Sequence, residues 1–447
     1  METAPLAGNL KVQVTNRQIL SIALPITLAI LIPQINMLTN SIFLGHLGTD
    51  ALGNAGITGV YYLIFAVAGN GFNNALQTVF SRSAGSGNPE HFKIIQAQGI
   101  RIALQFSVLC IAFTWLIAPL ILKQVADAAS FPVEMEFLKI RIWGLPFLFL
   151  FQLGNAFLVA SLNSRYLMIG FIVEAGVNIL FDYLFIFGHG GFTAMGFNGA
   201  AWASVMAEVA GMIVVYLVIF KTGLQKQYGL LQSFGFNKYF NKEILRVALP
   251  LVTQYIISVT TWLVFFILIE KHGTQAKAIS NVMRNVFGLA GVFVWAFAST
   301  TSSMVSNLMG QQHAHEVLRL VKRITLWSML FCFVVCTGLN VFPEVFFKLF
   351  GQSDAFIAEG TSVIRVVSLG IMLMSVANIW LNAVTGTGKT RVNLAIEIVA
   401  ISLYMIYTWY FMQVNYISLS MAWSNEFIYW TSIFLMAALF LYKGKWK

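Results

Sequence analysis

The chain has 447 residues, of which 58% are hydrophobic and only 10% are charged. Because so few charges cannot cover the surface of a soluble domain of this size, the composition excludes a water-soluble globular protein. The formal net charge is +10, and most of the 27 Lys and Arg residues lie in segments that we expect on one side of a membrane. This positive-inside bias explains the basic charge without a nucleic-acid partner, and it predicts that both termini are cytoplasmic.

The apolar residues gather in runs that are long enough to cross a bilayer, which takes about 20 helical residues. In chain order, we predict spans near residues 19–43, 53–78, 97–121, 141–160, 168–188, 198–220, 247–269, 279–305, 324–347, 363–384, 392–414 and 419–442. These runs predict an all-α integral membrane protein with about twelve transmembrane helices. We expect a multi-pass protein of the cell inner membrane, with the lipid bilayer around it.

The second half of the chain repeats the first. Ala23-Leu24-Pro25 recurs as Ala248-Leu249-Pro250, 225 residues later, and Ser81 recurs as Ser306 at the same shift. Six predicted spans fall in each copy, and a half-length repeat in an apolar chain is common among transporters. The repeat therefore predicts two pseudo-symmetric six-helix lobes. They are an N-lobe over 1–220 and a C-lobe over 247–447, joined by a cytoplasmic linker over 221–246.

Polar residues inside the predicted spans are candidate functional residues, because ionisable groups are costly there. The fifth span carries Glu174, Asn178 and Asp182 at spacings of four, so they share one helix face. This span is expected to run outward, which puts Asp182 in its outer third and Asn178 one turn deeper. By the same argument Asn40 and Ser204 lie at the level of Asp182.

A carboxylate, two amide oxygens and a hydroxyl at one level suit a small hard cation, or a proton held by the acid. A structural hydrogen-bond network between helices is the alternative, and these residues alone leave both open. The secondary candidates are Asn36, one turn below Asn40, Glu208, one turn below Ser204, and Glu174. Glu208 either extends the site or faces a water-filled cavity.

Other charged residues are expected to form structural ion pairs. The expected pairs are Glu174 and Glu397 with inner basic residues such as Arg165 or Lys389, and Glu270 with Arg284. Pro25 in the first span lacks an N–H and interrupts the hydrogen-bond ladder, so we expect a hinge there.

Five segments in this order resemble the multidrug and toxic compound extrusion (MATE) family of transporters, bacterial type. They are Ala23-Leu24-Pro25, Ser41-Ile42-Phe43-Leu44-Gly45-His46-Leu47-Gly48-Thr49-Asp50-Ala51-Leu52, Asn178-Ile179-Leu180-Phe181-Asp182, Gly199-Ala200-Ala201-Trp202-Ala203-Ser204 and Gly386-Thr387-Gly388-Lys389-Thr390. The resemblance implies twelve helices in two lobes around a central cavity. It also implies a secondary active exporter that moves amphipathic, often cationic, organic compounds against entry of H⁺ or Na⁺ by alternating access.

The resemblance also implies which residues bind the coupling ion. Family members use an Asp in helix one, an Asn and an Asp in helix five and a hydroxyl in helix six. Asn178, Asp182 and Ser204 match the last three, whereas Asn40 stands at the position of the helix-one Asp. Acids that some sodium-coupled relatives carry in helices seven and ten have no match, because Ser258 is near the first position and Met374–Asn378 holds no carboxylate.

We expect no enzyme, because the six His residues are scattered at loops and no catalytic cluster is visible. We also expect a monomer, no cofactor besides H⁺ or Na⁺ as coupling ion, and no metal beyond a Na⁺ ion at Asp182 and Asn178. A flippase of lipid-linked precursors from the same superfamily is the first alternative function. A membrane scaffold or receptor without transport is the second.

Overall fold

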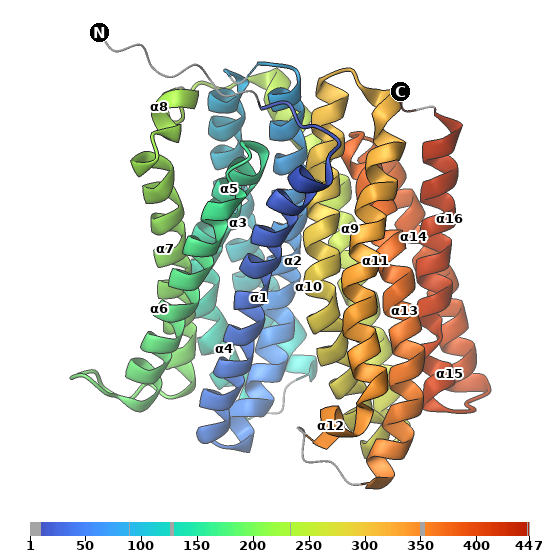
Figure 1. Cartoon of the computed structure of the whole chain (residues 1–447). Coiled ribbons are helices and arrows are strands. Elements are labelled where there is room, and N and C mark those ends of the chain that lie inside the picture. The colour runs from blue at the N-terminus through green and yellow to red at the C-terminus, as the bar shows by residue number, and fades with distance from the viewer. Residues whose placement is uncertain are drawn as a thin grey trace. The chain divides into compact units, whose positions relative to one another are not determined.

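The computed structural model describes residues 10–88, 90–125, 129–232, 234–348, 354–444 and 446. Within these ranges the secondary structure is helical, without β-strands, and 12 helices are long and apolar enough to cross a membrane (Figure 1). The predicted all-α class and the predicted number of spans are therefore confirmed. The extreme termini, which were predicted to be cytoplasmic, lie outside the described ranges.

The two halves have matching orders of helices. The first half contains α1 (Asn16–His46), α2 (Thr49–Gly85), α3 (His91–Val125), α4 (Ser130–Arg141), α5 (Leu145–Ala160), α6 (Leu167–Phe187), α7 (Phe197–Lys221) and α8 (Leu224–Tyr228). The second half contains α9 (Lys238–Glu270), α10 (Thr274–Gly310), α11 (Val317–Val341), α12 (Pro343–Lys348), α13 (Asp354–Gly386), α14 (Thr390–Trp409), α15 (Leu419–Trp423) and α16 (Asn425–Lys443). A short 3₁₀ turn joins α4 to α5, so these two helices form one span.

The chain folds into two compact units. The first contains Leu28–Ala248, and the second contains Leu249–Lys447 together with Lys11–Thr27. Hydrogen bonds explain why the segment before α1 belongs to the second unit. The Val12 N–H donates to Asn307 Oδ1 over 3.1 Å, and Gln311 Nε2 donates to the Val12 carbonyl over 3.0 Å.

In the first unit, α6 packs closely along α7. Gly199 on α7 lies so near the backbone of α6 that an added Cβ would stand 2.7 Å from the Phe185 carbonyl carbon. Gly170 on α6 likewise lies against Val215 on α7, where a Cβ would stand 2.6 Å from a methyl group. Small residues allow helices in a membrane to approach closely and gain van der Waals contact. This contact holds α6, and with it the Asn178 and Asp182 stripe, firmly in the first unit.

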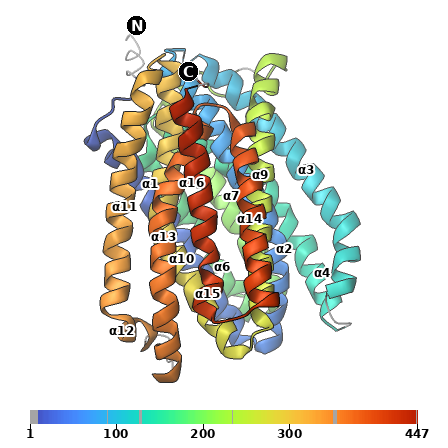
Figure 2. The same ribbon diagram turned by 90° about the vertical axis from the view of Figure 1, so that its right-hand side faces the viewer.

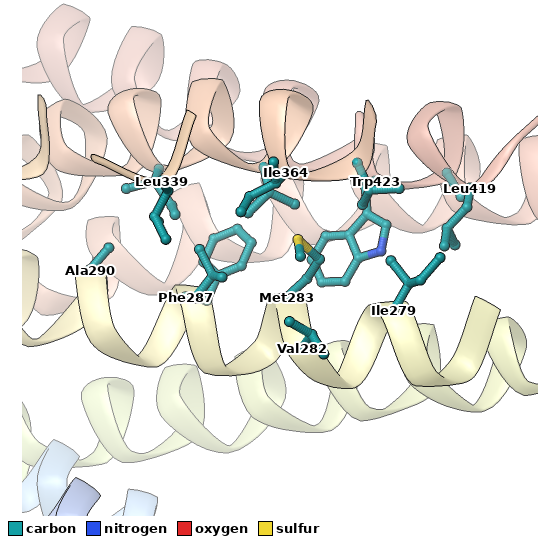
Figure 3. Packing of buried hydrophobic residues seen from close by; sticks show 14 of the residues in the cluster. Ile279, Val282, Met283, Phe287, Ala290, Leu339, Ile364, Leu419 and Trp423 are labelled. Atoms are coloured by element: carbon teal, nitrogen blue, oxygen red, sulfur yellow. The ribbon is translucent and has the colours of Figure 1, made fainter. Parts of the chain in front are cut away.

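The second unit has an aromatic core around Trp423, which is fully buried (Figure 3). The ring of Phe265 meets the Trp423 ring edge-on at 5.1 Å, and Phe287 stacks on it at 5.7 Å between centroids. The indole Nε1 donates to Ser280 Oγ over 3.1 Å, so the buried ring leaves no polar atom unsatisfied. This core joins α9, α10 and α15.

Two expectations drawn from the sequence, the start of the fourth span and the partner of Glu270, were wrong. The fourth span starts at Ser130 and not near 141, because polar residues such as Glu134 lower the local hydropathy although Glu134 is fully buried. Glu270 pairs with Lys277, whose Nζ lies 2.6 Å from the carboxylate, and not with Arg284. Arg284 instead lies over the ring of Phe266.

Candidate cation site

Helix α6 carries the stripe of polar residues that was predicted from spacing. Asn178 and Asp182 are one turn apart, and their side chains are 2% and 0% exposed. Apart from Glu174 and Tyr183 the rest of the helix is apolar, and its C-cap residue Gly188 has a left-handed conformation (φ 74°) that lets its N–H donate to the Leu184 carbonyl. An acid and an amide are therefore buried in the C-terminal half of a mostly apolar helix.

A hydrogen bond joins this stripe to helix α1. Asn36 Nδ2 donates to Asn178 Oδ1 over 2.8 Å. The remaining polar atoms of this pair, Asn36 Oδ1 and Asn178 Nδ2, are buried without a hydrogen-bond partner in the described part of the chain. The structure thus brings together two of the predicted residues and leaves each with one unused polar atom.

The carboxylate of Asp182 has no partner among the described residues. Both of its oxygens are buried and accept no hydrogen bond, and Asn40 Oδ1 is buried and unpaired as well. Neither Asn40 nor Ser204, both half-buried, forms a hydrogen bond with Asp182 in the described structure. An ionised carboxylate that is buried without a countercharge costs several kcal/mol. Asp182 is therefore expected either to bind a proton, which makes it neutral, or to pair with a cation.

The unpaired polar atoms of Asp182, Asn36 and Asn40 in the described structure are oxygens. The two carboxylate oxygens and the amide oxygens of Asn36 and Asn40 all act as acceptors. Hard cations are bound by carboxylate and amide oxygens, and a proton would satisfy the carboxylate by itself. No group of three or more His, Cys, Asp or Glu residues that could hold a metal ion gathers within the described ranges.

Glu208 does not extend this site. Its carboxylate forms a bidentate ion pair with Arg141, at 2.7 and 2.8 Å, and accepts a hydrogen bond from Tyr62 Oη at 2.9 Å. The guanidinium of Arg141 also lies over the Tyr62 ring, 3.7 Å from its centroid. The expectation that Glu208 joins the cation site or faces water was therefore wrong, because a buried arginine neutralises it.

Glu174 and Glu397 do not pair with Arg165 or Lys389 in the described structure. Arg165 donates instead to the hydroxyl of its neighbour Tyr166 over 3.0 Å. Glu174 lies against Gly211 on α7, where an added Cβ would stand 3.2 Å from the Glu174 Cβ. Glu397 is held by uncharged donors on other helices of the second unit.

Comparison with known proteins decides the family. The MatE family model matches residues 25–184 and 250–410, one segment in each half of the chain. The chain belongs to the MatE family. Members of this family are transporters, so the chain is a multi-pass membrane transporter and not an enzyme. The resemblance that the sequence motifs indicated is confirmed.

Individual relatives agree with this assignment. A probable multidrug resistance protein NorM of Thermotoga maritima is 23% identical over 443 residues, which cover 96% of this chain and 93% of that protein. A probable NorM of Synechocystis is 22% identical and covers 87% of this chain and 86% of its own length. A solved structure of a multidrug resistance MATE family transporter of the MOP superfamily, in an outward-facing conformation, has a TM-score of 0.88 at 16% identity and covers 100% of both chains. At this identity the last likeness shows the fold alone.

In this MatE-family transporter, the predicted hinge residue Pro25 is half-buried within α1. The helix continues through it from Asn16 to His46. The boundary between the two compact units falls three residues later, between Thr27 and Leu28. A proline that lacks an N–H therefore stands next to the point where α1 passes from one unit to the other.

The residues that sequence reasoning missed in this MatE-family chain are Arg141 and Tyr62. Because the fourth span was predicted to begin at 141, Arg141 was placed at the membrane surface. The span begins at Ser130, so Arg141 lies eleven residues into α4, and Glu208 lies eleven residues into α7. Both helices begin on the same side, so a correct span start would have put the two charges at one depth.

Proposed function

We propose that this MatE-family transporter exports amphipathic organic compounds, many of them cationic, in exchange for H⁺ or Na⁺ that enters the cell. The names of its relatives as multidrug resistance proteins support the substrate class. The observation that carries the coupling role is Asp182, whose two carboxylate oxygens are buried and unpaired in the described structure. A group with this cost must take up a positive ion from outside the protein.

In this proposal the coupling ion binds Asp182 and the unpaired amide oxygens of Asn36 and Asn40, with Asn178 and Ser204 beside them. Binding neutralises the carboxylate and adds attraction between α6 and the outer half of α1, which Asn36 already joins to Asn178. This attraction bends α1 near Pro25, where the proline lacks an N–H and the helix therefore lacks one backbone hydrogen bond. The ion thus acts on α1, the helix that both compact units share.

The protein acts as a monomer in the cell inner membrane, with both termini cytoplasmic and with the bilayer as its surroundings. It needs neither a nucleic acid nor a resident cofactor. Small amphipathic organic compounds are its transported partners. The apolar helices and the positive-inside bias support the membrane location and the orientation, and the other statements are proposals about this chain.

The test is transport in proteoliposomes that contain the purified full chain and a fluorescent cationic dye. A pH gradient and a sodium gradient are imposed in separate experiments, and a protonophore or a sodium ionophore serves as control. We expect one of the two gradients to drive dye movement that the matching ionophore abolishes. Dye movement that neither gradient accelerates would contradict the proposal.

A further inference from the structure

A second buried acid lies in the other unit. Glu397 on α14 is 0% exposed, and three side chains of neighbouring helices converge on its carboxylate. Gln254 Nε2 and Ser258 Oγ, both on α9, lie 3.3 Å and 2.5 Å from its two oxygens. Tyr429 Oη on α16 hydrogen bonds to the same oxygen as Ser258. Helix α14 packs beside α16, as Figure 2 shows, and Glu397 connects this pair to α9.

No positive charge accompanies this carboxylate. No ion pair in the described structure includes Glu397, and the titratable group in contact with it is Tyr429 on α16, which also lies near Glu426 on the same helix. Helix α9 contributes only uncharged groups, and on α13 the uncharged Gly370 lies against Glu426. An ionised Glu397 would therefore stand buried among neutral or acidic neighbours, which is costly.

The contacts around Glu397 need one more hydrogen atom than the neighbouring side chains supply if every contact is to be a hydrogen bond. The Ser258 hydroxyl has a single proton but lies within hydrogen-bonding distance of two acceptors, Glu397 Oε1 and the Gln254 carbonyl at 2.8 Å. When Glu397 carries a proton, it donates to Ser258 Oγ, and the Ser258 proton turns to the Gln254 carbonyl. Both contacts are then hydrogen bonds.

The side-chain oxygen of Gln254 also supports a proton on Glu397. Gln254 is 8% exposed, and its Oε1 is buried without a partner in the described part of the chain. A buried acceptor that stays unpaired is destabilising. A half-turn of the amide would let Gln254 Oε1 accept a hydrogen bond from the other carboxyl oxygen of Glu397 when that oxygen carries the proton. The site thus offers a carboxyl proton two uncharged acceptors, one on each side.

We propose that Glu397, with Gln254, Ser258 and Tyr429, forms a proton-binding site in the second unit. The ligand is a proton and not a metal ion, because the three groups that contact the carboxylate are a neutral amide and two hydroxyls, and none of its contacts in the described structure is to a second acid that would help to hold a metal ion. The bound proton ties α9, one turn after Pro250, to α14 and α16. Its loss leaves a buried charge without a positive partner, which destabilises this packing of α9, α14 and α16. That this proton takes part in transport rests on the proposed function, whereas its binding does not.

The first test measures proton binding directly. Infrared difference spectra of the purified full chain, recorded across a pH titration, report the C=O stretch of protonated carboxyl groups. We expect Glu397→Gln to remove one titrating component that Asp182→Asn retains. Two further variants, Ser258→Ala and Tyr429→Phe, keep the acid and should each move the midpoint of that component by about one pH unit, since a hydrogen bond is worth about 1 kcal/mol.

A titration in which Glu397→Gln matches the wild type would overturn the site. If Glu397→Gln does not fold, unchanged midpoints in both Ser258→Ala and Tyr429→Phe would overturn it equally. The second test counts protons per dye molecule in the proteoliposomes. We expect a lower ratio in Glu397→Gln, and an unchanged ratio would overturn the role in transport. If no ion gradient drives dye movement in the wild type, the proposed function fails while the infrared component remains.

Discussion

The repeat-related helices α1 and α9 are attached to their units in different ways. In the first unit, Asn36 on α1 bonds to Asn178 on α6, and the nearby acid Asp182 has no partner among the described residues. In the second unit, Gln254 and Ser258 on α9 both bond to the acid itself, Glu397 on α14. The first carboxylate has no hydrogen-bond partner among the described residues, whereas the second lies among neutral groups that can share a proton with it.

The 225-residue repeat shows that this difference lies in the side chains and not in the arrangement of the helices. It places Ser258 on Pro33 and Gln254 on Ala29, so α1 carries no polar side chain where α9 meets its acid. The polar residue of α1, Asn36, comes almost one turn later. The two lobes therefore share an architecture but surround their buried acids differently. An acid without a partner suits an ion that enters from outside the protein, whereas an acid with neutral hydrogen-bonding neighbours suits a proton that it shares with them.

The strongest stability effect should come from the third acid, Glu208, whose partner is a full charge. Arg141→Met leaves Glu208 buried without its countercharge, which typically costs about 3–5 kcal/mol. We expect a large fall in the thermal unfolding temperature of the purified protein. The double variant Arg141→Met/Glu208→Gln should recover most of the loss, since no unpaired charge remains. A single variant as stable as the wild type would show that the pair is not needed to neutralise Glu208.

A smaller effect, on the affinity for the coupling ion, is expected when a carboxylate is introduced at Asn40. Asn40→Asp adds a carboxylate at a residue of the proposed cation site and should increase the attraction for a cation. We expect half-maximal transport at about tenfold lower concentration of the coupling ion, which corresponds to about 1.4 kcal/mol. The matched control is Asn415→Asp, because Asn415 is exposed and lies after α14. Equal shifts in both variants would mean that the change acts through general charge and not through the site.

The smallest effect is expected at the hydrogen bond between α1 and α6. Asn36→Leu removes a bond of 2.8 Å between two helices, and such bonds in a membrane contribute about 0.6 kcal/mol on average. We expect a small loss of stability. A double-mutant cycle with Asn178→Leu measures the pair itself, and additive effects of the two substitutions would show that the bond contributes nothing.

The sequence predicted the fold and part of the site because both depend on regular spacing. Apolar runs and the repeat indicated the helices, and spacings of four put Asn178 and Asp182 on one face of α6. Side-chain partners across helices were harder, because they depend on depth and rotation. Arg141 was missed since acidic residues hid the start of its span, and Glu397 was assigned a basic partner although Ser258 and Gln254 on α9 hold it.

The central claim is that coupling depends on the unpaired acid of the first unit, and Asp182→Asn tests it most directly. The variant keeps the shape of the side chain and removes its charge. Proteoliposomes with wild type, Asp182→Asn and the exposed control Glu90→Gln are given the same ion gradient, and dye movement is recorded. The account predicts that Asp182→Asn folds and loses gradient-driven movement while the control retains it. Full gradient-driven movement in Asp182→Asn would contradict the account.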